Sequence, residues 1–313
     1  LKHASNVPQV AGAIEGIFLA AGFPEGVFQS LRIPGDRVAA LVADRRIKAA
    51  TLTGSEPAGA SLAAACGRAI KPTVLELGGS DPLIICPSAD LGAAVPTAAT
   101  ARLLNNGQSC IAAKRLITIG DIGADFQAQL VATFQAIKVG DPLDPEVDVG
   151  PLATAAISDE LADQVDRAIV AGAQVLVGGD RSALQASMPE ALRGGYFYPP
   201  TILAGLSPSA PIAQEEFFGP VALLFHVKSL DEAIALANDT PFGLGASAWT
   251  QDASEAHRCI NELEAGAVFI NGLVKSDPRL PFGGSKRSGY GRELAAVGMR
   301  EFVNLKTVWM QGL

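Results

Sequence analysis

The segment Thr73-Val74-Leu75-Glu76-Leu77-Gly78-Gly79 sets the pattern for the rest of the chain. Its apolar residues predict a buried strand over 73–77 that ends at the two glycines. A second apolar run over 83–86 predicts another strand, and Asp90 is placed to begin the helix after it. Because such strands and helices alternate along the chain, the sequence predicts an α/β fold with mostly parallel sheets.

The other elements follow from the same alternation. Helices are expected over residues 10–21, 55–70, 126–137, 158–171, 229–238 and 253–264. Strands are expected over residues 48–53, 115–119, 174–177, 221–227, 246–250 and 267–270. Ser229 and Glu232 fit a capping box at the start of their helix. The Pro- and Gly-rich segment 140–151 predicts a loop.

Composition narrows the class of protein. The chain has 313 residues, which predicts about two domains. Hydrophobic residues make up 49% and charged residues 18%, which excludes a disordered chain. The net charge of −8 argues against binding to nucleic acid or to an anionic membrane surface. No apolar run is long enough to predict a transmembrane helix, and the first residues do not resemble a signal peptide.

The cysteines and histidines give no sign of a metal site. Cys66, Cys86, Cys110 and Cys259 form no CxxC pair, and the three histidines lie far apart in the sequence. The cysteine spacing does not suggest a disulfide framework either. We therefore expect reduced thiols and a cytoplasmic location.

Cys110 is the first candidate for catalysis. It ends the polar segment Asn105-Asn106-Gly107-Gln108-Ser109-Cys110, which follows a helix-like stretch that ends at Leu104. A thiol on such a turn can reach a cleft, and neighbouring backbone N–H groups can lower its pKa. The pattern alone favours a small buried packing thiol, which is what most free cysteines are.

Glu76 is the second candidate. It lies between two leucines at the end of a predicted strand, and the carboxyl ends of parallel strands are common ligand sites. A desolvated carboxylate there can act as a general base, and Gly78 and Gly79 would let a flat ligand approach the backbone. A carboxylate at the rim of a turn explains the pattern equally well.

Six motifs, in order, resemble the aldehyde dehydrogenase superfamily. They are Leu52-Thr53-Gly54-Ser55, Leu75-Glu76-Leu77-Gly78-Gly79, Asn106-Gly107-Gln108-Ser109-Cys110, Glu215-Glu216-Phe217-Phe218-Gly219-Pro220, Asn271-Gly272 and Pro281-Phe282-Gly283-Gly284-Ser285-Lys286-Arg287-Ser288-Gly289. Each motif is weak alone, but six in the family's order are specific. The segment Lys275-Ser276-Asp277-Pro278-Arg279-Leu280 is most similar to the bacterial succinate-semialdehyde dehydrogenase branch.

The resemblance implies a fold and a chemistry. It implies a partial Rossmann-type dinucleotide-binding domain over 1–78, an α/β catalytic domain over 79–287, and a C-terminal helix and oligomerisation strand over 288–313. Cys110 would attack the aldehyde carbon, hydride would pass to NADP or NAD, and Glu76 would activate the water that hydrolyses the thioester. Succinate semialdehyde is the expected substrate. Transfer of the thioester to coenzyme A is the enzymatic alternative, and Glu76 argues against it.

The resemblance also implies binding residues. Glu216 would hold the ribose hydroxyls beside the nicotinamide, because two carboxylate oxygens suit a vicinal diol. Phe218 would pack beside the cofactor. The helix that begins near Gly54 and Ser55 would direct its N-terminus at a phosphate of the cofactor. The resemblance also places Leu77 and Gly78 in the cofactor site.

Further residues bear on the choice of cofactor and substrate. Lys2 matches a family lysine near the adenosine ribose, and Ser5 stands where many NAD-preferring members have Glu, so NADP is the expected cofactor, with NAD also accepted. Ser276 and Arg279 are candidate partners for the substrate carboxylate.

The chain departs from the family at its N-terminus. Members carry an Asn upstream of the position of Lys2 whose side chain completes an oxyanion hole, and such a donor is worth roughly 10²–10³ in rate. We therefore expect a fragment of reduced activity or a cofactor-binding pseudoenzyme as the alternative to an active enzyme. Residues 302–309 read as a strand that extends a neighbouring subunit's sheet, which would give a homodimer or homotetramer.

Overall fold

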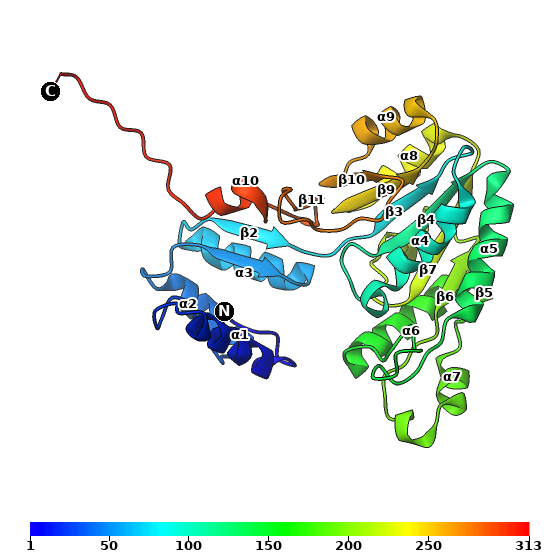
Figure 1. Ribbon diagram of the computed structural model, residues 1–313, viewed down its shortest axis with the longest axis horizontal. Coiled ribbons are helices and arrows are strands. Elements are labelled where there is room, and N and C mark those ends of the chain that lie inside the picture. Colours follow the sequence, from blue (N-terminus) through cyan, green and yellow to red (C-terminus); the bar gives the residue numbers. More distant parts are fainter. Residues whose placement is uncertain (313) are drawn as a thin grey trace. The chain divides into compact units, whose positions relative to one another are not determined.

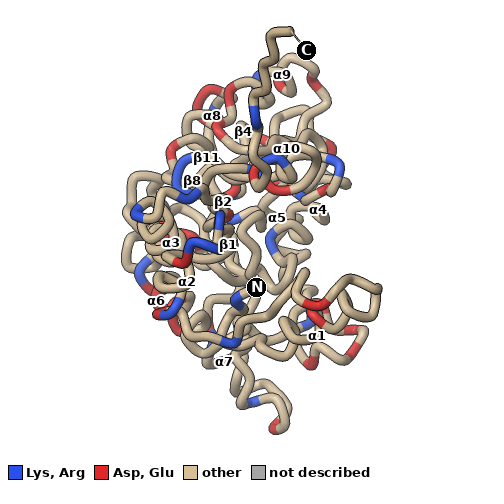
Figure 2. Tube along the Cα trace, turned by 90° about the vertical axis from the view of Figure 1, so that its left-hand side faces the viewer, with Lys and Arg blue, Asp and Glu red and all other residues tan. Residues whose placement is uncertain are grey.

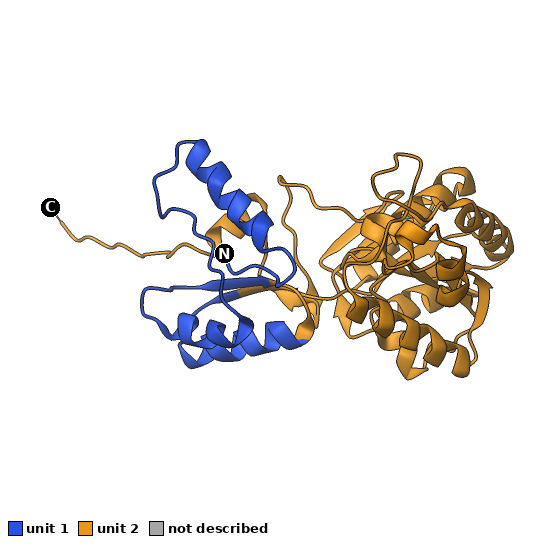
Figure 3. Ribbon diagram, turned by 90° about the horizontal axis from the view of Figure 1, so that it is seen from below, with its two compact units in different colours: residues 1–52, 57–73 blue, residues 53–56, 74–313 orange. Residues whose placement is uncertain are grey.

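The computed structural model describes residues 1–312 and forms two compact units. One unit comprises residues 1–52 and 57–73, and the other comprises residues 53–56 and the chain from residue 74 onward (Figure 3). Acidic and basic residues are interspersed along the trace of the chain (Figure 2). Among residues 1–312, no helix is both long and apolar enough to cross a membrane.

The first unit is mainly helical. Its elements are α1 (Pro8–Ala20), a 3₁₀ turn (Gly35–Arg37), α2 (Val38–Ala43), most of β1 (Ala50–Thr53) and most of α3 (Glu56–Arg68). Pro8 suits the first turn of a helix because its missing N–H has no intrahelical partner there. The chain turns away after α1 at Gly22, whose φ of +86° favours glycine.

The second unit is built on a seven-stranded sheet in the order β10-β9-β3-β4-β7-β6-β5. The strands are β3 (Asp81–Ile85), β4 (Ala113–Ile119), β5 (Gln174–Val177), β6 (Thr201–Ala204), β7 (Val221–Val227), β9 (Gly245–Trp249) and β10 (Ala267–Ile270). Every pairing is parallel except that of β5 with β6. The predicted, mostly parallel sheet is therefore confirmed.

Helices cover both faces of this sheet (Figure 1). The covering helices are α4 (Leu91–Leu103), α5 (Ile122–Ala136), α6 (Ala155–Val170), α8 (Leu230–Asn238) and α9 (Ala253–Glu262). The second unit also contains α7 (Arg181–Ser187) and α10 (Ala295–Arg300), which contribute to neither core. On β4, Leu116 packs in the core with α4 and α5, whereas the next residue, Ile117, packs in the core with α6, α8 and α9. Because both faces are covered, the central strands are buried along their length and do not alternate between buried and exposed residues.

Short strands complete the second unit. They are β2 (Thr73–Glu76), β8 (Phe242–Gly243), β11 (Ser285–Lys286) and β12 (Gly289–Tyr290). β12 pairs antiparallel with β2 and places Gly289 opposite Glu76, and β11 pairs antiparallel with β8. The short helical turns are Leu104–Gly107, Glu190–Leu192 and Pro211–Gln214.

Most predicted elements are confirmed, some with shifted ends. The strands over 174–177, 221–227 and 267–270 have the predicted bounds. Asp90 caps α4 by accepting a hydrogen bond from the N–H of Gly92, as predicted. Ser229 caps α8 by accepting from the N–H of Glu232, but Glu232 reaches the N–H of Lys228 and not that of Ser229, so the capping box is displaced by one residue.

The predicted strand over 302–309 is not formed in this chain. Residues 301–303 make a turn, and residues 304–312 have no regular structure. Leu305 and Trp309 are 84% and 78% exposed. Apolar side chains suggest a strand in the sequence, but a β-strand is defined by hydrogen bonds to a neighbour, and none of the described strands pairs with this segment.

Candidate active site

The segment that carries Cys110 has an unusual backbone. After α4 the chain enters the turn 104–107, in which Asn105, Asn106 and Gly107 have φ of 52°, 58° and 74°. Asn tolerates this left-handed conformation better than most residues, and Gly adopts it freely. The residue types at 105–107 are therefore those that the turn needs, and the turn presents half-buried Cys110 just before β4.

Side chains of the same motif fasten this turn to a second loop. The Asn106 amide donates to the carbonyl of Pro151 at 3.1 Å and accepts from the N–H of Gly150 at 3.0 Å. The Gln108 side-chain oxygen accepts from the N–H of Ala153 at 2.8 Å. Since these bonds replace water on both partners, the polar residues before Cys110 hold the loop in place.

Arg102 ties the Cys110 segment to the segment that carries Glu216. It is fully buried, and its Nη2 donates to the carbonyls of Gly107 and Phe217, each at 3.0 Å, and to that of Gly219. A Cβ atom at Gly107 would collide with the main chain of Gly219. The two segments therefore lie in direct contact, and only glycine fits at position 107.

The Glu216 carboxylate lies against the two glycines that follow Glu76. Its Oε1 accepts from the N–H of Gly79 at 3.1 Å. A Cβ atom at Gly78 would collide with its Oε2, and one at Gly79 would collide with the carbonyl oxygen of Cys110. The glycine pair thus leaves room for the protein's own carboxylate and cysteine main chain, whereas the sequence suggested room for a ligand.

Lys114 contacts both the Cys110 segment and the Glu216 carboxylate. It lies on β4, its side chain is fully buried, and its Nζ lies 3.1 Å from Glu216 Oε1. The same Nζ donates to the carbonyls of Ser109 at 2.5 Å and Cys110 at 2.8 Å. An ammonium group has three protons, so these three acceptors satisfy it completely.

The pKa of the Cys110 thiol is raised above its ordinary value. Burial is the main cause, because it disfavours the thiolate, and the carboxylates of Asp81 and Glu216 act in the same direction. Lys114 and the N–H of Ile111 oppose the shift. The resting thiol is therefore largely protonated at neutral pH and has to lose its proton before it can act as a nucleophile.

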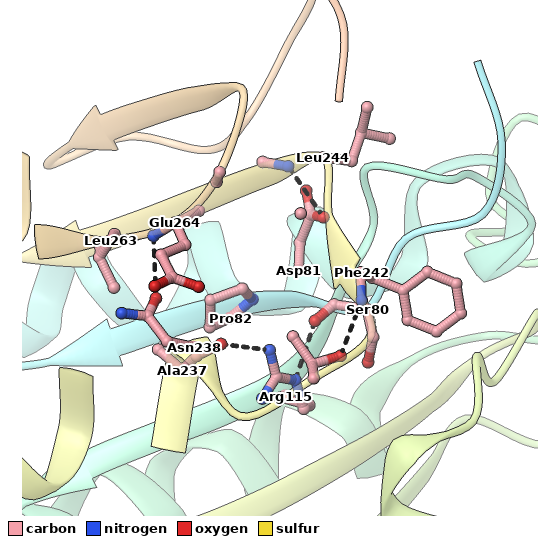
Figure 4. A pocket seen from close by; sticks show the side chains of 15 residues that line it. Ser80, Asp81, Pro82, Arg115, Ala237, Asn238, Phe242, Leu244, Leu263 and Glu264 are labelled. Atoms are coloured by element: carbon pink, nitrogen blue, oxygen red, sulfur yellow. Dashed lines mark hydrogen bonds between the residues drawn. The ribbon is translucent and has the colours of Figure 1, made fainter. Parts of the chain in front are cut away.

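Asp81 is a further buried acid near this segment. Its pKa is raised to about 7, chiefly by burial. Its Oδ1 accepts from the N–H of Gly245 at 3.1 Å, and its Oδ2 has no hydrogen-bond partner among residues 1–312. In Figure 4, Asp81 points toward this bond to β9, and Arg115 reaches from the other side of the small pocket to the carbonyl of Ala237.

Glu76 lies at the end of β2 and is 2% exposed. Neither carboxylate oxygen has a hydrogen-bond partner among the described residues. Burial raises the pKa of Glu76 to about 8, the negative charge of Glu293 adds to the rise, and Arg292 opposes it. A Cβ atom at Gly283 would collide with the carbonyl oxygen of Gly291 and would lie 2.9 Å from Glu76 Oε1, so position 283 needs glycine.

The main chain around Glu76 is held on both sides. Its carbonyl accepts from the N–H of Gly54 at 3.0 Å, and the N–H of Leu77 donates to the carbonyl of Ser288 at 2.9 Å. The structure thus brings Gly78, Cys110 and Glu216 together. Glu76 lies two residues before Gly78, and its carboxylate makes no hydrogen bond to Cys110.

The remaining predicted binding residues are more exposed. Ser55 directly precedes α3, and Phe218 is half-buried beside Glu216. Ser276 and Arg279 lie in an exposed loop, where the Arg279 guanidinium pairs with Asp277 at 2.6 Å. In the first unit, Lys2 and Ser5 are both exposed, and Lys2 forms an isolated bridge with Leu31.

Sequence reasoning missed three buried charges of this site, namely Arg102, Lys114 and Asp81. The sequence contained a sign of two of them. Lys114 and Asp81 are charged residues that stand next to runs predicted as buried strands. A charge in such a run needs a partner or a function. Arg102 had no comparable signal, since a helix accommodates arginine without strain.

Comparison with known proteins places these motifs in context. Residues 1–308 match the model of the aldehyde dehydrogenase family. A probable NADP⁺ succinate-semialdehyde dehydrogenase of Synechocystis is 57% identical over 310 residues, which cover 99% of this chain and 66% of that protein. Succinate-semialdehyde dehydrogenase [NADP(+)] 1 of Mycobacterium tuberculosis is 55% identical with the same coverage.

A solved structure agrees with these sequences. The succinic semialdehyde dehydrogenase of Streptococcus pyogenes, crystallised with NADP⁺, superposes with a TM-score of 0.94 at 39% identity and covers 100% of this chain and 67% of that one. The chain therefore spans about two thirds of the length of the proteins that it resembles.

Proposed function

Because the chain belongs to the aldehyde dehydrogenase family, we propose that it supplies the nucleophile, the general base and the ribose-binding carboxylate for NAD(P)-dependent oxidation of an aldehyde. One observation carries the proposal: the Cys110 main chain, the Glu216 carboxylate and the Gly78-Gly79 turn meet at one place, next to a strand that ends in the unpartnered acid Glu76. The names of the relatives support succinate semialdehyde as the aldehyde.

The reaction begins at the sulfur of Cys110. Once the thiol has lost its proton, the thiolate adds to the aldehyde carbon and forms a carbon–sulfur bond, and the carbonyl π electrons move to oxygen. When that oxyanion re-forms its carbonyl, the carbon loses hydride and the product is a thioester on Cys110. NADP or NAD supplies the hydride acceptor when it is bound.

Glu76 acts in the second half of the reaction. Its carboxylate takes a proton from water, the resulting hydroxide adds to the thioester carbon, and the carbon–sulfur bond breaks to release the acid and the thiolate. Because the pKa of Glu76 is raised to about 8, the basic form becomes more populated as the pH rises from neutrality toward 8. Thioester hydrolysis is therefore expected to be faster in mildly alkaline solution.

Glu216 is suited to hold the cofactor ribose. Its Oε1 is fixed by the N–H of Gly79 and by Lys114, whereas its Oε2 accepts no hydrogen bond from the described residues. A fixed carboxylate with an available oxygen is a fitting acceptor for a ribose hydroxyl. Phe218, Leu77, Gly54 and Ser55 complete the proposed cofactor contacts.

NADP is the proposed preferred cofactor, and NAD the second. The two curated relatives are named for NADP⁺. Lys2 offers a positive charge that suits a 2′-phosphate, and the Ser5 hydroxyl does not repel it. The ratio of kcat/KM for NADP⁺ to that for NAD⁺ tests this point, and Lys2→Ala should lower the ratio.

Ser276 and Arg279 are the proposed partners of the substrate carboxylate. A hydroxyl and a guanidinium are both donors to carboxylate, and both belong to the same exposed loop. For assembly we propose a homodimer or homotetramer in which residues 302–309 add to a neighbouring subunit's sheet, because an unpaired apolar strand favours such pairing.

The test uses Cys110→Ala and the matched control Cys66→Ala, since Cys66 is a buried free thiol outside the site. NADPH formation from succinate semialdehyde should stop in Cys110→Ala and continue in Cys66→Ala. Mass spectrometry of the wild-type chain should find the aldehyde-derived adduct on Cys110. Turnover that survives in Cys110→Ala would refute the proposal. One hydride transferred per chain without turnover would identify the impaired fragment.

A further inference from the structure

Lys114 contacts both functional residues of the proposed site at once. Its Nζ bonds to the carbonyl of Cys110 at 2.8 Å and to the carboxylate of Glu216 at 3.1 Å. We propose that Lys114 is a positioning residue that holds the nucleophile and the ribose-binding carboxylate in a fixed relation. This inference rests on the proposed function, since it gives the roles of the two residues that Lys114 connects.

The contacts of Lys114 differ in kind from those of Arg102, a second buried cation of the region. Arg102 also spans the two segments, but it binds only main-chain carbonyls on them. Lys114 binds the carbonyls of Ser109 and Cys110 on one segment and a side-chain carboxylate on the other. Arg102 therefore joins the loops, whereas Lys114 acts on the group that is to bind the cofactor.

The buried charges around Lys114 explain why a lysine can be placed there. Lys114 interacts with both Glu216 and Asp81, and each of these carboxylates has a second cation: Arg102 for Glu216 and Arg115 for Asp81. An unpaired buried charge is very costly, but a paired and fully hydrogen-bonded one is tolerated. Loss of the ammonium would leave the carboxylates without this partner and would leave the carbonyl of Cys110 without its donor, whereas the carbonyl of Ser109 would keep the N–H of Ala112.

Two consequences follow for measurable properties. Without the ammonium, the negative charge of Glu216 acts on the Cys110 sulfur without the opposing charge of Lys114, so the thiolate becomes harder to form. The Glu216 carboxylate also loses one of the two contacts that fix its Oε1, so its alignment for a ribose hydroxyl becomes poorer. A lysine that only filled space would have neither effect.

The experiment compares Lys114→Met with Lys71→Met. Methionine keeps the length of the side chain and removes its charge. Lys71 is a matched control because its Nζ also caps main-chain carbonyls, those of Val42 and Asp44, and neither belongs to the Cys110 segment. The readouts are the pH midpoint of Cys110 alkylation by iodoacetamide, followed by mass spectrometry, and the Kd for NADP⁺ measured by fluorescence titration.

For Lys114→Met we expect the alkylation midpoint to rise by about one pH unit or more and the Kd for NADP⁺ to rise about tenfold. Lys71→Met should change neither quantity. An unchanged midpoint together with an unchanged Kd, in a variant whose circular dichroism is native, would overturn the proposal. Neither readout needs turnover, so a wild-type chain that does not oxidise the aldehyde, with both effects present in Lys114→Met, would count against the proposed function alone.

If Lys114→Met does not fold, the double variant Lys114→Met/Glu216→Gln takes its place, because it removes both charges of the ion pair. Its reference is Glu216→Gln. The positioning role predicts slower alkylation of Cys110 in the double variant than in Glu216→Gln at every pH below the midpoint, since the carbonyl of Cys110 has still lost its donor and the thiolate a nearby cation. Equal alkylation rates would overturn the proposal.

Discussion

Glu76→Gln should change how the free energy of unfolding depends on pH. The Glu76 side chain is 2% exposed and its carboxylate has no hydrogen-bond partner among the described residues. Burial, reinforced by the charge of Glu293, raises its pKa from 4.5 to about 8 in the folded chain. In the unfolded chain water solvates the carboxylate, and the ordinary value returns.

The direction in which the free energy of unfolding changes with pH follows from this difference in pKa. The folded chain binds the Glu76 proton more tightly, so the stability that the neutral carboxyl contributes is complete below pH 4.5 and declines as the pH rises to about 8. At about 1.4 kcal/mol for each pH unit, the decline amounts to at most about 5 kcal/mol. Glutamine stays neutral, so the variant escapes this decline.

Urea unfolding at pH 5, 6, 7, 8 and 9 measures the effect. Glu76→Gln and the wild type should be nearly equally stable at pH 5, and the variant should be more stable by several kcal/mol at pH 9. Glu160→Gln, at an exposed position on α6, is the control and should give the same difference from the wild type at every pH. A constant difference between Glu76→Gln and the wild type across this range would refute the reasoning.

Three further predictions test the geometry. Gly79→Ala should slow alkylation of the nucleophile more than Gly78→Ala, because a Cβ at 79 meets main chain whereas one at 78 meets the end of a side chain; equal effects would contradict this. Asn106→Ala should lower the free energy of unfolding by about 1–3 kcal/mol through two lost hydrogen bonds, as measured by urea titration. In steady-state kinetics, Ser276→Ala should raise KM for succinate semialdehyde more than Arg279→Ala, because the guanidinium is already engaged in an ion pair; the reverse order would contradict this.

Much of the fold could be predicted because its strands are buried on both faces. The run 83–86, which contains Ile84, is apolar throughout, and the run that contains Ile117 is mostly apolar, which is typical of a parallel sheet covered by helices. Cys110 and Glu76 were identifiable because each stands beside glycine at the end of a predicted element. The element ends were less predictable, since caps such as the one at Glu232 depend on which N–H group the side chain reaches.

The electrostatics of the site could not be predicted in the same way. Lys114 and Asp81 have their effect through partners distant in the sequence, Glu216 and Gly245, and spacing does not reveal those pairs. The segment 302–309 forms no strand within this chain for a related reason, and its pairing with a neighbouring subunit stays a prediction. Its apolar pattern indicates a tendency to pair, but a strand also needs a neighbour with free backbone groups.

The anchoring of β2 has a consequence for the timing of the proposed acid–base step. The backbone on both sides of Glu76 is hydrogen-bonded, to Gly54 and to Ser288, while the carboxylate itself is held by no hydrogen bond from the described residues. Reorientation of this acid then requires rotation about its side-chain bonds and breaks no hydrogen bond from the described residues. Solvent viscosity should accordingly leave the hydrolytic half of the cycle unaffected.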